Sequence, residues 1–362
     1  MKLFRGGLRV VCAVLLAVAL LAGNFGVPQT AQAAGSWVKV GGTVAKGDDI
    51  FYALTAAKGG TVYVCYTKVG SDNGADFYVK KLDGTKWKQV GGAIEGYCLD
   101  FFVADDKLYA GTPWCLYVYS GGKWVKKTTS GLPTNYVVYQ WTVSKGIAYA
   151  AYYVVDDYSD QYGAMASVYI RKLSGSKWVA QGGRLTQFPY ELENWDWYTI
   201  AEYKGRLYHA STLGTAVKKY SSGKWITAAK RKNVGGAAVL EKSSDALYLL
   251  STNSYEFSIE HNYLNVMVEK LSKGKMVKQG STVKADGLYG LETYNKSVYL
   301  YHGYNGKLYV KKLKGGKWSP VGSSLSISKT WYGTASLCIA KGTPHVAYVD
   351  KSGNLIVRRY KS

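Results

Sequence analysis

Acidic and aromatic side chains gather in three long segments, residues 151–168, 184–198 and 252–265. Together the segments hold eight Asp and Glu residues and twelve aromatic residues, and Arg184 is their only Lys or Arg. Trp and Tyr rings stack on the flat apolar faces of sugars, and carboxylates accept hydrogen bonds from sugar hydroxyls. The pattern predicts a carbohydrate-binding site; the alternative is surface loops ordered by their own aromatic packing. The candidate ligand-binding residues are Trp195, Asp196, Trp197, Tyr190, Glu193, Asp157, Tyr158 and Tyr255.

Carboxylates offer two further kinds of chemistry. Calcium takes oxygen ligands, and Asp156, Asp157 and Asp160 are the candidates to hold one ion; no other cofactor is expected. Paired carboxylates hydrolyse glycosides, one as acid and the other as nucleophile or base. Acids on the predicted innermost strands are candidates for that role, but single acids there equally line a water-filled channel. These acids are Asp100, Glu202, Glu241 and Glu292.

The histidines give no support for nucleophilic catalysis. His209, His261, His302 and His345 lie in different repeats, and no Ser or Cys motif accompanies them. We expect His209 and His302 to be ordinary strand residues. We therefore assign no catalytic residue from the sequence.

One short motif recurs along the chain, first as KLDGTKWKQVGG at residues 81–92. It predicts a β-hairpin with a turn at Asp83, Gly84 and Thr85 and with Trp87 on the exit strand. Each period also contains two earlier strands, so the repeating unit has four. We expect the large apolar residue of each exit strand to pack between adjacent sheets. Its later equivalents are Trp124, Trp178, Trp225, Met276 and Trp318.

A seventh copy is divided between the ends of the chain. GSWVKVGG (residues 35–42) resembles the second half of the hairpin, and NLIVRRYKS (residues 354–362) resembles the first half. Joining the halves closes a ring and hides the sheet edges that otherwise invite aggregation. The sequence thus predicts an all-β protein, a seven-bladed β-propeller with four-stranded blades over residues 34–362. Its ring is closed by the N-terminal strand joining the C-terminal blade.

Two stretches carry a family resemblance. GTPHVAYVDKSGNLIVRRY (residues 342–360) and LYVKKLKGGKWSPVG (residues 308–322) resemble the kelch-like propeller repeats of secreted bacterial proteins. The resemblance covers residues 36–362. It implies the propeller fold but no particular activity, because such propellers serve as binding modules, adhesins and occasionally enzymes.

The first residues predict export. A basic start is followed by the apolar run VVCAVLLAVALLA at residues 10–22 and by small residues at 31–33, as in a cleaved signal peptide of residues 1–33. We expect a secreted, extracellular or cell-surface-associated protein without a transmembrane anchor. Four cysteines follow the signal. Export permits disulfides between them in three pairings, and four buried thiols are the alternative. They are Cys65, Cys98, Cys115 and Cys338.

The chain is strongly basic, with a formal net charge of +22, which becomes +19 when Lys2, Arg5 and Arg9 leave with the signal. The seven hairpins hold 25 of the remaining 43 basic residues and only two acids, Asp83 and Glu269. We expect the hairpins to form a positive rim that attracts anionic polymers. Lysines on edge strands also prevent edge-to-edge pairing, which is the alternative explanation. The face built from tight turns is expected to carry little specificity.

These observations favour a secreted, non-catalytic binding module. We expect glycan or cell-surface binding through the acidic and aromatic loop face, with the basic rim contacting a polysaccharide or another anionic cell-surface polymer. A protein-binding or structural matrix component is one alternative, and a polysaccharide-active enzyme is another. We expect a monomer and no nucleic-acid partner.

Overall fold

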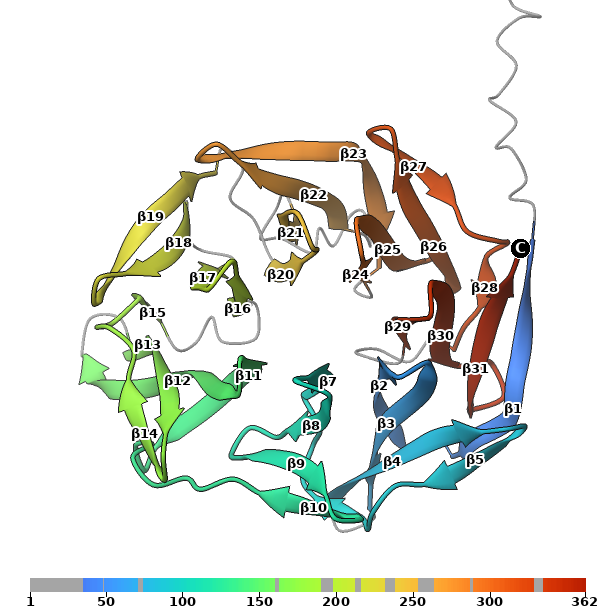
Figure 1. The fold of residues 1–362 in the computed structure, drawn as a ribbon, viewed down its shortest axis with the longest axis horizontal. Coiled ribbons are helices and arrows are strands. Elements are labelled where there is room, and N and C mark those ends of the chain that lie inside the picture. The colour runs from blue at the N-terminus through green and yellow to red at the C-terminus, as the bar shows by residue number, and fades with distance from the viewer. Residues whose placement is uncertain are drawn as a thin grey trace, which may run out of the picture.

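The structure is a computed structural model that describes residues 35–47, 49–70, 74–159, 163–189, 198–211, 216–231, 238–252, 264–286, 289–328 and 335–362. Every helix or strand assigned in these ranges is a β-strand, and none of this part of the chain forms a helix suited to crossing a membrane. The strands form four-stranded antiparallel units that follow one another around a ring (Figure 1).

In every unit except the one that the two chain ends share, the four strands pair in chain order, from the middle of the ring outwards. The first unit consists of β2 (Ile50–Lys58), β3 (Thr61–Val69), β4 (Ala75–Asp83) and β5 (Lys86–Gln89). The second consists of β7 (Asp100–Ala104), β8 (Lys107–Gly111), β9 (Leu116–Ser120) and β10 (Lys123–Lys126). The third consists of β11 (Tyr136–Ser144), β12 (Ile147–Ser159), β13 (Gly163–Ser174) and β14 (Lys177–Ala180). Short strands extend three units: β6 (Ile94–Glu95) pairs with β4, β15 (Thr186–Pro189) with β13, and β28 (Leu325–Ser326) with β26 (Lys307–Lys314).

The later units follow the same order. They consist of β16 (Tyr198–Tyr203), β17 (Arg206–Ser211), β18 (Ala216–Ser221) and β19 (Lys224–Lys230); of β20 (Ala238–Lys242), β21 (Leu247–Thr252), β22 (Leu264–Ser272) and β23 (Lys275–Ala285); and of β24 (Tyr289–Tyr294), β25 (Ser297–Tyr304), β26 and β27 (Lys317–Pro320). One parallel pair, Lys230 with Lys275, links β19 to β23, so these two units count as one eight-stranded sheet.

The two ends of the chain share a unit. β29 (Ala335–Ala340), β30 (Thr343–Val349) and β31 (Asn354–Lys361) are completed by β1 (Ser36–Lys46), which runs antiparallel to β31. Trp37 lies opposite Tyr360, and Lys46 lies opposite Asn354. The predicted pairing of the first strand with the last three is therefore present, and it covers the outer edge of β31.

The innermost strands contact one another around the whole ring: β2 with β7, β7 with β11, β11 with β16, β16 with β20, β20 with β24, β24 with β29, and β29 with β2. Apolar clusters lie between neighbouring units. One cluster joins Leu116 of β9 to Val138 of β11, and another joins Ile170 of β13 to Ile200 of β16. Burial of this surface is the main favourable contribution to folding.

In the repeated hairpin, the indole of the exit-strand Trp donates a hydrogen bond to a backbone carbonyl of the unit before it. The Trp87 indole Nε1 donates to the Val40 carbonyl, 3.3 Å away, and Trp124 Nε1 donates to Val90, 2.8 Å away. The glycine after the preceding exit strand makes room for the ring, because a Cβ on Gly91 would lie 2.6 Å from Trp124 Cδ1. The prediction that these residues pack between sheets is confirmed. The same donation is made by Trp37, Trp178 and Trp225.

Candidate functional site

The residues predicted to bind sugar fall mostly outside the described part of the chain. Tyr190, Glu193, Trp195, Asp196, Trp197 and Tyr255 are outside it, as is Asp160 of the predicted calcium triad. The backbones of Asp156, Asp157 and Tyr158 form the end of β12, and their side chains are not described. The sugar and calcium sites therefore stay predictions.

The backbone nevertheless brings two of the three predicted segments together. β12 and β13 form the longest hairpin, in which Asp156 pairs with Met165. β15 then adds to β13, with Met165 opposite Pro189 and Ala166 opposite Phe188. Residues 165–168 and 186–189, which belong to two of the predicted segments, thus lie side by side at the end of one unit. The third segment connects β21 to β22, two units further along the ring.

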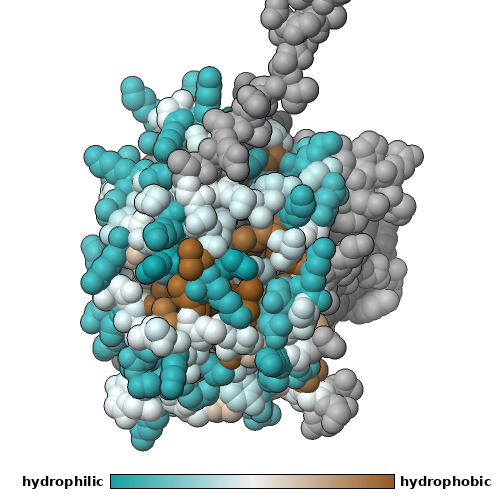
Figure 2. Space-filling model, turned by 90° about the vertical axis from the view of Figure 1, so that its right-hand side faces the viewer, coloured by the Kyte–Doolittle hydropathy of each residue, from teal (hydrophilic) through white to brown (hydrophobic). Residues whose placement is uncertain are grey.

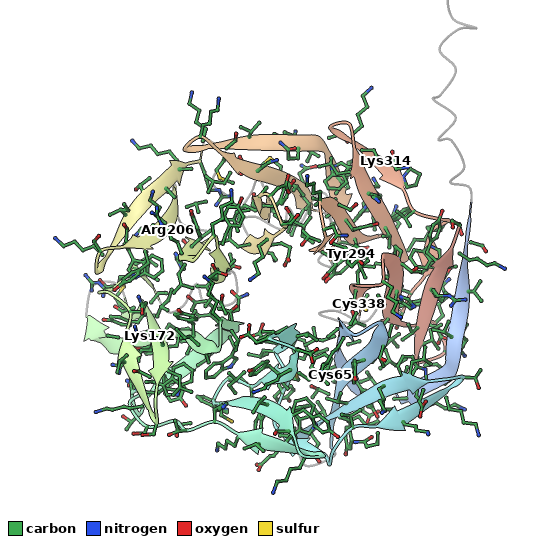
Figure 3. The ribbon with its side chains drawn as sticks, viewed as in Figure 1. Cys65, Lys172, Arg206, Tyr294, Lys314 and Cys338 are labelled. Atoms are coloured by element: carbon green, nitrogen blue, oxygen red, sulfur yellow. The ribbon has the colours of Figure 1, made fainter. Side chains whose placement is uncertain are left out.

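An exposed lysine is present on the outermost strand of every unit. On six of these strands it is the first residue, directly after the hairpin turn. Lys314, at the end of β26, lies at the outer edge of the ring (Figure 3). Figure 2, which looks onto the side carrying β1, shows hydrophilic residues around a smaller hydrophobic area. The exposed lysines are Lys39, Lys86, Lys123, Lys177, Lys224, Lys275 and Lys317.

Part of the predicted rim points between the units instead of outwards. Lys80 Nζ donates to the Val44 carbonyl of the preceding unit at 2.6 Å, whereas Arg358 Nη1 donates to the Trp37 carbonyl of its own unit at 3.1 Å. Arg171 donates to the Gly131 carbonyl and Lys218 to the Leu185 carbonyl, both in segments that follow the last strand of the preceding hairpin. Burial lowers the pKa of Lys311. Lys80, Arg171 and Lys218 thus link a unit to the chain before it, and Arg358 is engaged within its own unit, so the rim available to a partner is smaller than the count of 25 suggests.

The unit of β20–β23 carries an acid, Glu269, at the hairpin position where five other units carry Lys or Arg and the β7–β10 unit carries Tyr117. Glu269 pairs in this position with Arg231, which follows β19, at 3.8 Å between Oε2 and Nε. Burial raises the pKa of Glu269, and the Arg231 charge opposes that shift. Arg231 also donates to the Ser211 carbonyl. The acid of this hairpin is thus matched internally, and it does not face a partner.

Four side-chain oxygens link one innermost strand to the backbone of the next. Asp100 Oδ2 accepts from Trp141 N at 2.7 Å, and Gln140 Oε1 accepts from Ile200 N at 2.6 Å. Thr199 accepts from Leu240 N, and Ser336 accepts from Thr55 N. Burial raises the pKa of Asp100 to about 7, and the Trp141 hydrogen bond lowers it. Asp100 therefore has a structural role in spacing the innermost strands.

The other innermost acids differ from one another. Burial acts to raise the pKa of Glu202, but hydrogen bonds from Ser144 and Gly205, together with the Lys242 charge, bring it below its usual range. Ser144 Oγ lies 2.8 Å from Glu202 Oε2, and Lys242 Nζ lies 3.5 Å from the same oxygen. Glu202 is therefore an ionised, structurally engaged carboxylate at neutral pH.

Among the innermost acids that the structure describes, Glu241 and Glu292 lie close enough for the charge of one to act on the other. They occupy equivalent positions on the neighbouring strands β20 and β24, and both are partly exposed. Burial raises the pKa of Glu241 to about 7, although Thr293 Oγ1 donates to it at 3.3 Å. Burial and the charge of Glu241 hold the pKa of Glu292 well above its usual range. At neutral pH this pair therefore retains a proton.

The remaining reactive side chains are buried. Burial lowers the pKa of His209 to about 3 and that of His302 to about 4, so both rings are neutral at physiological pH. The four thiols are free and buried; Cys338 lies towards the middle of the ring (Figure 3). Among the described residues, no group of three or more His, Cys, Asp or Glu is placed to hold a metal ion.

No protein-family model and no curated protein matches this sequence. Solved structures match its shape. A chain in a structure of S. cerevisiae Dbp5 bound to Nup159, Gle1, IP6 and ADP aligns with a TM-score of 0.54 and 9% identity, over 92% of this chain and 97% of that one. The β-propeller domain of the Trilobed protease from Pyrococcus furiosus aligns with a TM-score of 0.50 and 8% identity, over 87% and 96%.

These matches agree with the ring of antiparallel units, and they show a β-propeller fold. The identities are too low for a function to be transferred, because one fold hosts many functions. A function for this chain has to be argued from its own residues.

Proposed function

We propose that this chain is a secreted, kelch-like, seven-bladed β-propeller that binds an anionic cell-surface polymer without catalysing a reaction. The observation that carries the proposal is the exposed lysine on the outermost strand of every unit. Lysine on an edge strand discourages aggregation, but acidic side chains would do the same. The use of one sign of charge around the whole ring favours an anionic partner.

The acidic and aromatic segments supply the second element of the proposal, a glycan-binding loop face. The hydrogen-bonded ladder between β13 and β15 supports it, because residues 165–168 and 186–189 of two of these segments pair with each other. Carboxylates repel an acidic polymer, so we assign this face to neutral sugars and the lysines to the polymer's charged groups.

Co-sedimentation tests both elements. The protein lacking residues 1–33 is mixed with purified cell walls and with insoluble polysaccharides at roughly 0.05 to 0.5 M salt, because screening lengths fall across this range. Rim binding should disappear as salt rises. Glycan binding should survive salt and fail in a Trp195→Ala/Trp197→Ala variant. Salt-sensitive binding to a protein component, indifferent to added sugars, would favour the protein-binding alternative. A protein that stays in the supernatant at every salt concentration contradicts the proposal.

The Glu241 and Glu292 pair favours a polysaccharide-active enzyme as the second candidate. Hydrolysis of a glycosidic bond needs one carboxylic acid that is still protonated near neutral pH and one carboxylate. The test is the release of reducing ends from neutral and acidic polysaccharides. If activity appears, Glu241→Gln and Glu292→Gln should each abolish it, whereas Glu95→Gln, at an exposed residue outside the pair, should leave it unchanged. Activity that persists in both pair variants would exclude these residues as the catalytic pair.

A further inference from the structure

The tight turns of the innermost strands touch one another around the ring. Because the strands alternate in direction, the turns between the first and second strands of all units lie on one face, together with the hairpin tips. We call this face the turn face. Asp106 pairs with Lys58 of the neighbouring turn at 3.5 Å, and Asp105 accepts a hydrogen bond from Gly146 N.

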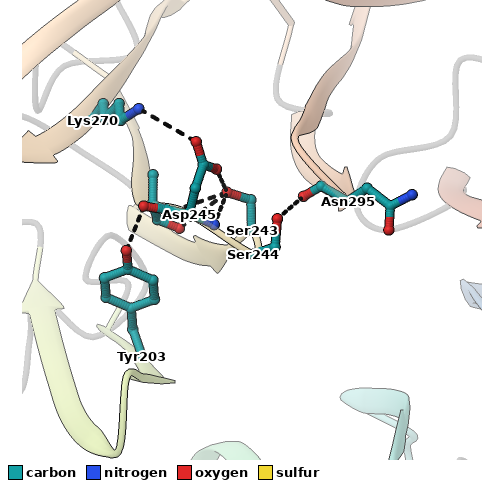
Figure 4. A network of polar contacts seen from close by, with 7 residues as sticks. Tyr203, Ser243, Ser244, Asp245, Lys270 and Asn295 are labelled. Carbon is teal, nitrogen blue, oxygen red and sulfur yellow. Dashed lines mark hydrogen bonds and ion pairs between the residues drawn. The ribbon is translucent and has the colours of Figure 1, made fainter.

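The circle of turn contacts continues through the other units. Tyr203 OH donates to the Asp245 carbonyl at 2.5 Å, and Ser244 Oγ donates to the Asn295 carbonyl at 3.1 Å (Figure 4). Tyr294 lies against Gly342, where a Cβ would be 3.5 Å from its ring. Gly60 faces the Lys341 side chain, and Gly205 lies near Lys145 Nζ. The turns thus form a continuous belt whose members hold each other in place.

Positive charge lines this belt, whereas its acids bond within it. Lys107, Lys145, Lys204, Lys296 and Lys341 are exposed, and within the described residues none of them takes part in an ion pair. By contrast, Asp245 accepts from Ser243 Oγ at 2.7 Å and lies 4.0 Å from Lys270 (Figure 4). The lysines at the hairpin tips continue the same face outwards.

Three of the five exposed belt lysines have a backbone conformation that their turns impose. Lys145, Lys204 and Lys341 all have a positive φ, between 49° and 51°. A residue held in this region has the direction of its Cα–Cβ bond fixed by the turn. The lysines therefore start from defined points around the ring, and positive charges repeated in this way favour an extended, repeating anionic ligand.

We propose that the turn face is the docking surface for the charged groups of an acidic polysaccharide, and that the loop face does not bind them. This inference rests on the proposed function and names the surface that performs it. The loop segments carry eight acids and one arginine, so they repel such a polymer, while the turn face presents five exposed lysines without ion pairs and its acids Asp105, Asp106 and Asp245 are hydrogen-bonded or ion-paired among the described residues. Carboxylate-bearing polymers of uronic acids have the required chemistry.

The test compares two variants that each lose three positive charges. The turn-face variant is Lys145→Asn/Lys204→Asn/Lys341→Asn, because Asn tolerates positive φ. The control variant is Lys230→Gln/Lys284→Gln/Lys351→Gln, whose exposed residues lie at the opposite ends of the strands or in the β30–β31 connection. Binding to immobilised polygalacturonate is measured at low salt, and thermal unfolding checks that both variants fold.

Each exposed ion pair contributes a factor of about two to three, so the turn-face variant should bind about tenfold more weakly and the control variant within about twofold of the parent. Equal weakening in both variants would overturn the assignment of the face but leave the proposed function standing. A parent that polygalacturonate does not retain would overturn the proposed function itself. Retention on phosphatidylglycerol vesicles but not on polygalacturonate would identify a lipid surface as the partner and contradict our choice of ligand.

Discussion

At the scale of single residues, the innermost strands separate structural from potentially reactive carboxyls. Asp100 and Glu202 each accept hydrogen bonds from the neighbouring strand. Burial raises the pKa of both Glu241 and Glu292, and the charge of Glu241 raises that of Glu292 further, because two like charges close together do not both ionise easily. This pair has a consequence for stability that does not depend on any function.

The pair should make the protein less stable as pH rises. The pKa of Glu241 is about 7 in the folded protein and close to its ordinary value when unfolded, so the folded state binds more protons across this interval and loses free energy relative to the unfolded state. We expect the free energy of unfolding to fall by about 1–3 kcal/mol between pH 5 and pH 8. Urea unfolding at both pH values measures the fall.

The Glu292→Gln variant should reduce that fall, because it removes a carboxyl whose pKa is held well above its usual range in the folded protein. The contribution of Asp100, whose pKa is also about 7, should remain. Glu95→Gln, at an exposed position, is the control and should behave like the parent. An identical pH dependence in the parent and in Glu292→Gln would contradict a raised pKa for Glu292 in the folded protein.

The thiols should be inert in the folded protein. All four are buried, and burial raises the pKa of Cys65 and of Cys338, so little thiolate is present at neutral pH. An aromatic disulfide reagent should therefore react with none of them at pH 8 until urea unfolds the chain. Rapid labelling of one thiol in the native protein would mean that the strand carrying it opens.

At the scale of elements, the two glycines that follow the exit strand β5, Gly91 and Gly92, have different roles. Gly91 has φ of +74° and faces Trp124, whereas Gly92 has open space where a Cβ would lie. Both the backbone conformation and the close approach demand glycine at the first position only.

Gly91→Ala should therefore destabilise the protein by about 1–3 kcal/mol, because the new methyl group is strained and displaces the Trp124 ring. Gly92→Ala is the matched control and should change the free energy of unfolding by less than about 0.5 kcal/mol. Urea unfolding of both variants decides the matter. Similar losses in the two variants would show that the indole contact is not what the first glycine protects.

At the scale of the whole molecule, the pairing of β1 with β31 joins the two ends of the chain. The ladder runs from Ser36 opposite Lys361 to Lys46 opposite Asn354, with Arg358 Nη1 bonded to the Trp37 carbonyl. Without β1 the edge of β31 would be unpaired, and an exposed edge of this length invites association.

A chain that starts after Lys46 should therefore unfold more easily, by several kcal/mol, and should form oligomers during size-exclusion chromatography. A chain that starts at Gly35 retains β1 and serves as the control. If the shorter chain were monomeric and as stable as the control, ring closure would contribute little to the fold.

The sequence by itself determined the strands, the repeating unit, the Trp and Gly of each hairpin and the joining of the two ends. These features are local patterns or repeats of a local pattern, and a period can be recognised without knowing where the units lie in space. The sugar site predicted from the sequence falls mostly on residues outside the described structure. The structure shows only that residues 165–168 pair with residues 186–189.

Only the tertiary structure decided which charges face a partner. Lys80 and Lys86 look alike in the repeat, yet the first donates to a carbonyl of the preceding unit and the second is exposed. Glu241 and Glu292 are a whole repeat apart in the chain and meet because adjacent innermost strands are brought together by the ring. Such contacts depend on the angle and distance between units, which arise from packing across the ring and leave no mark in a local pattern.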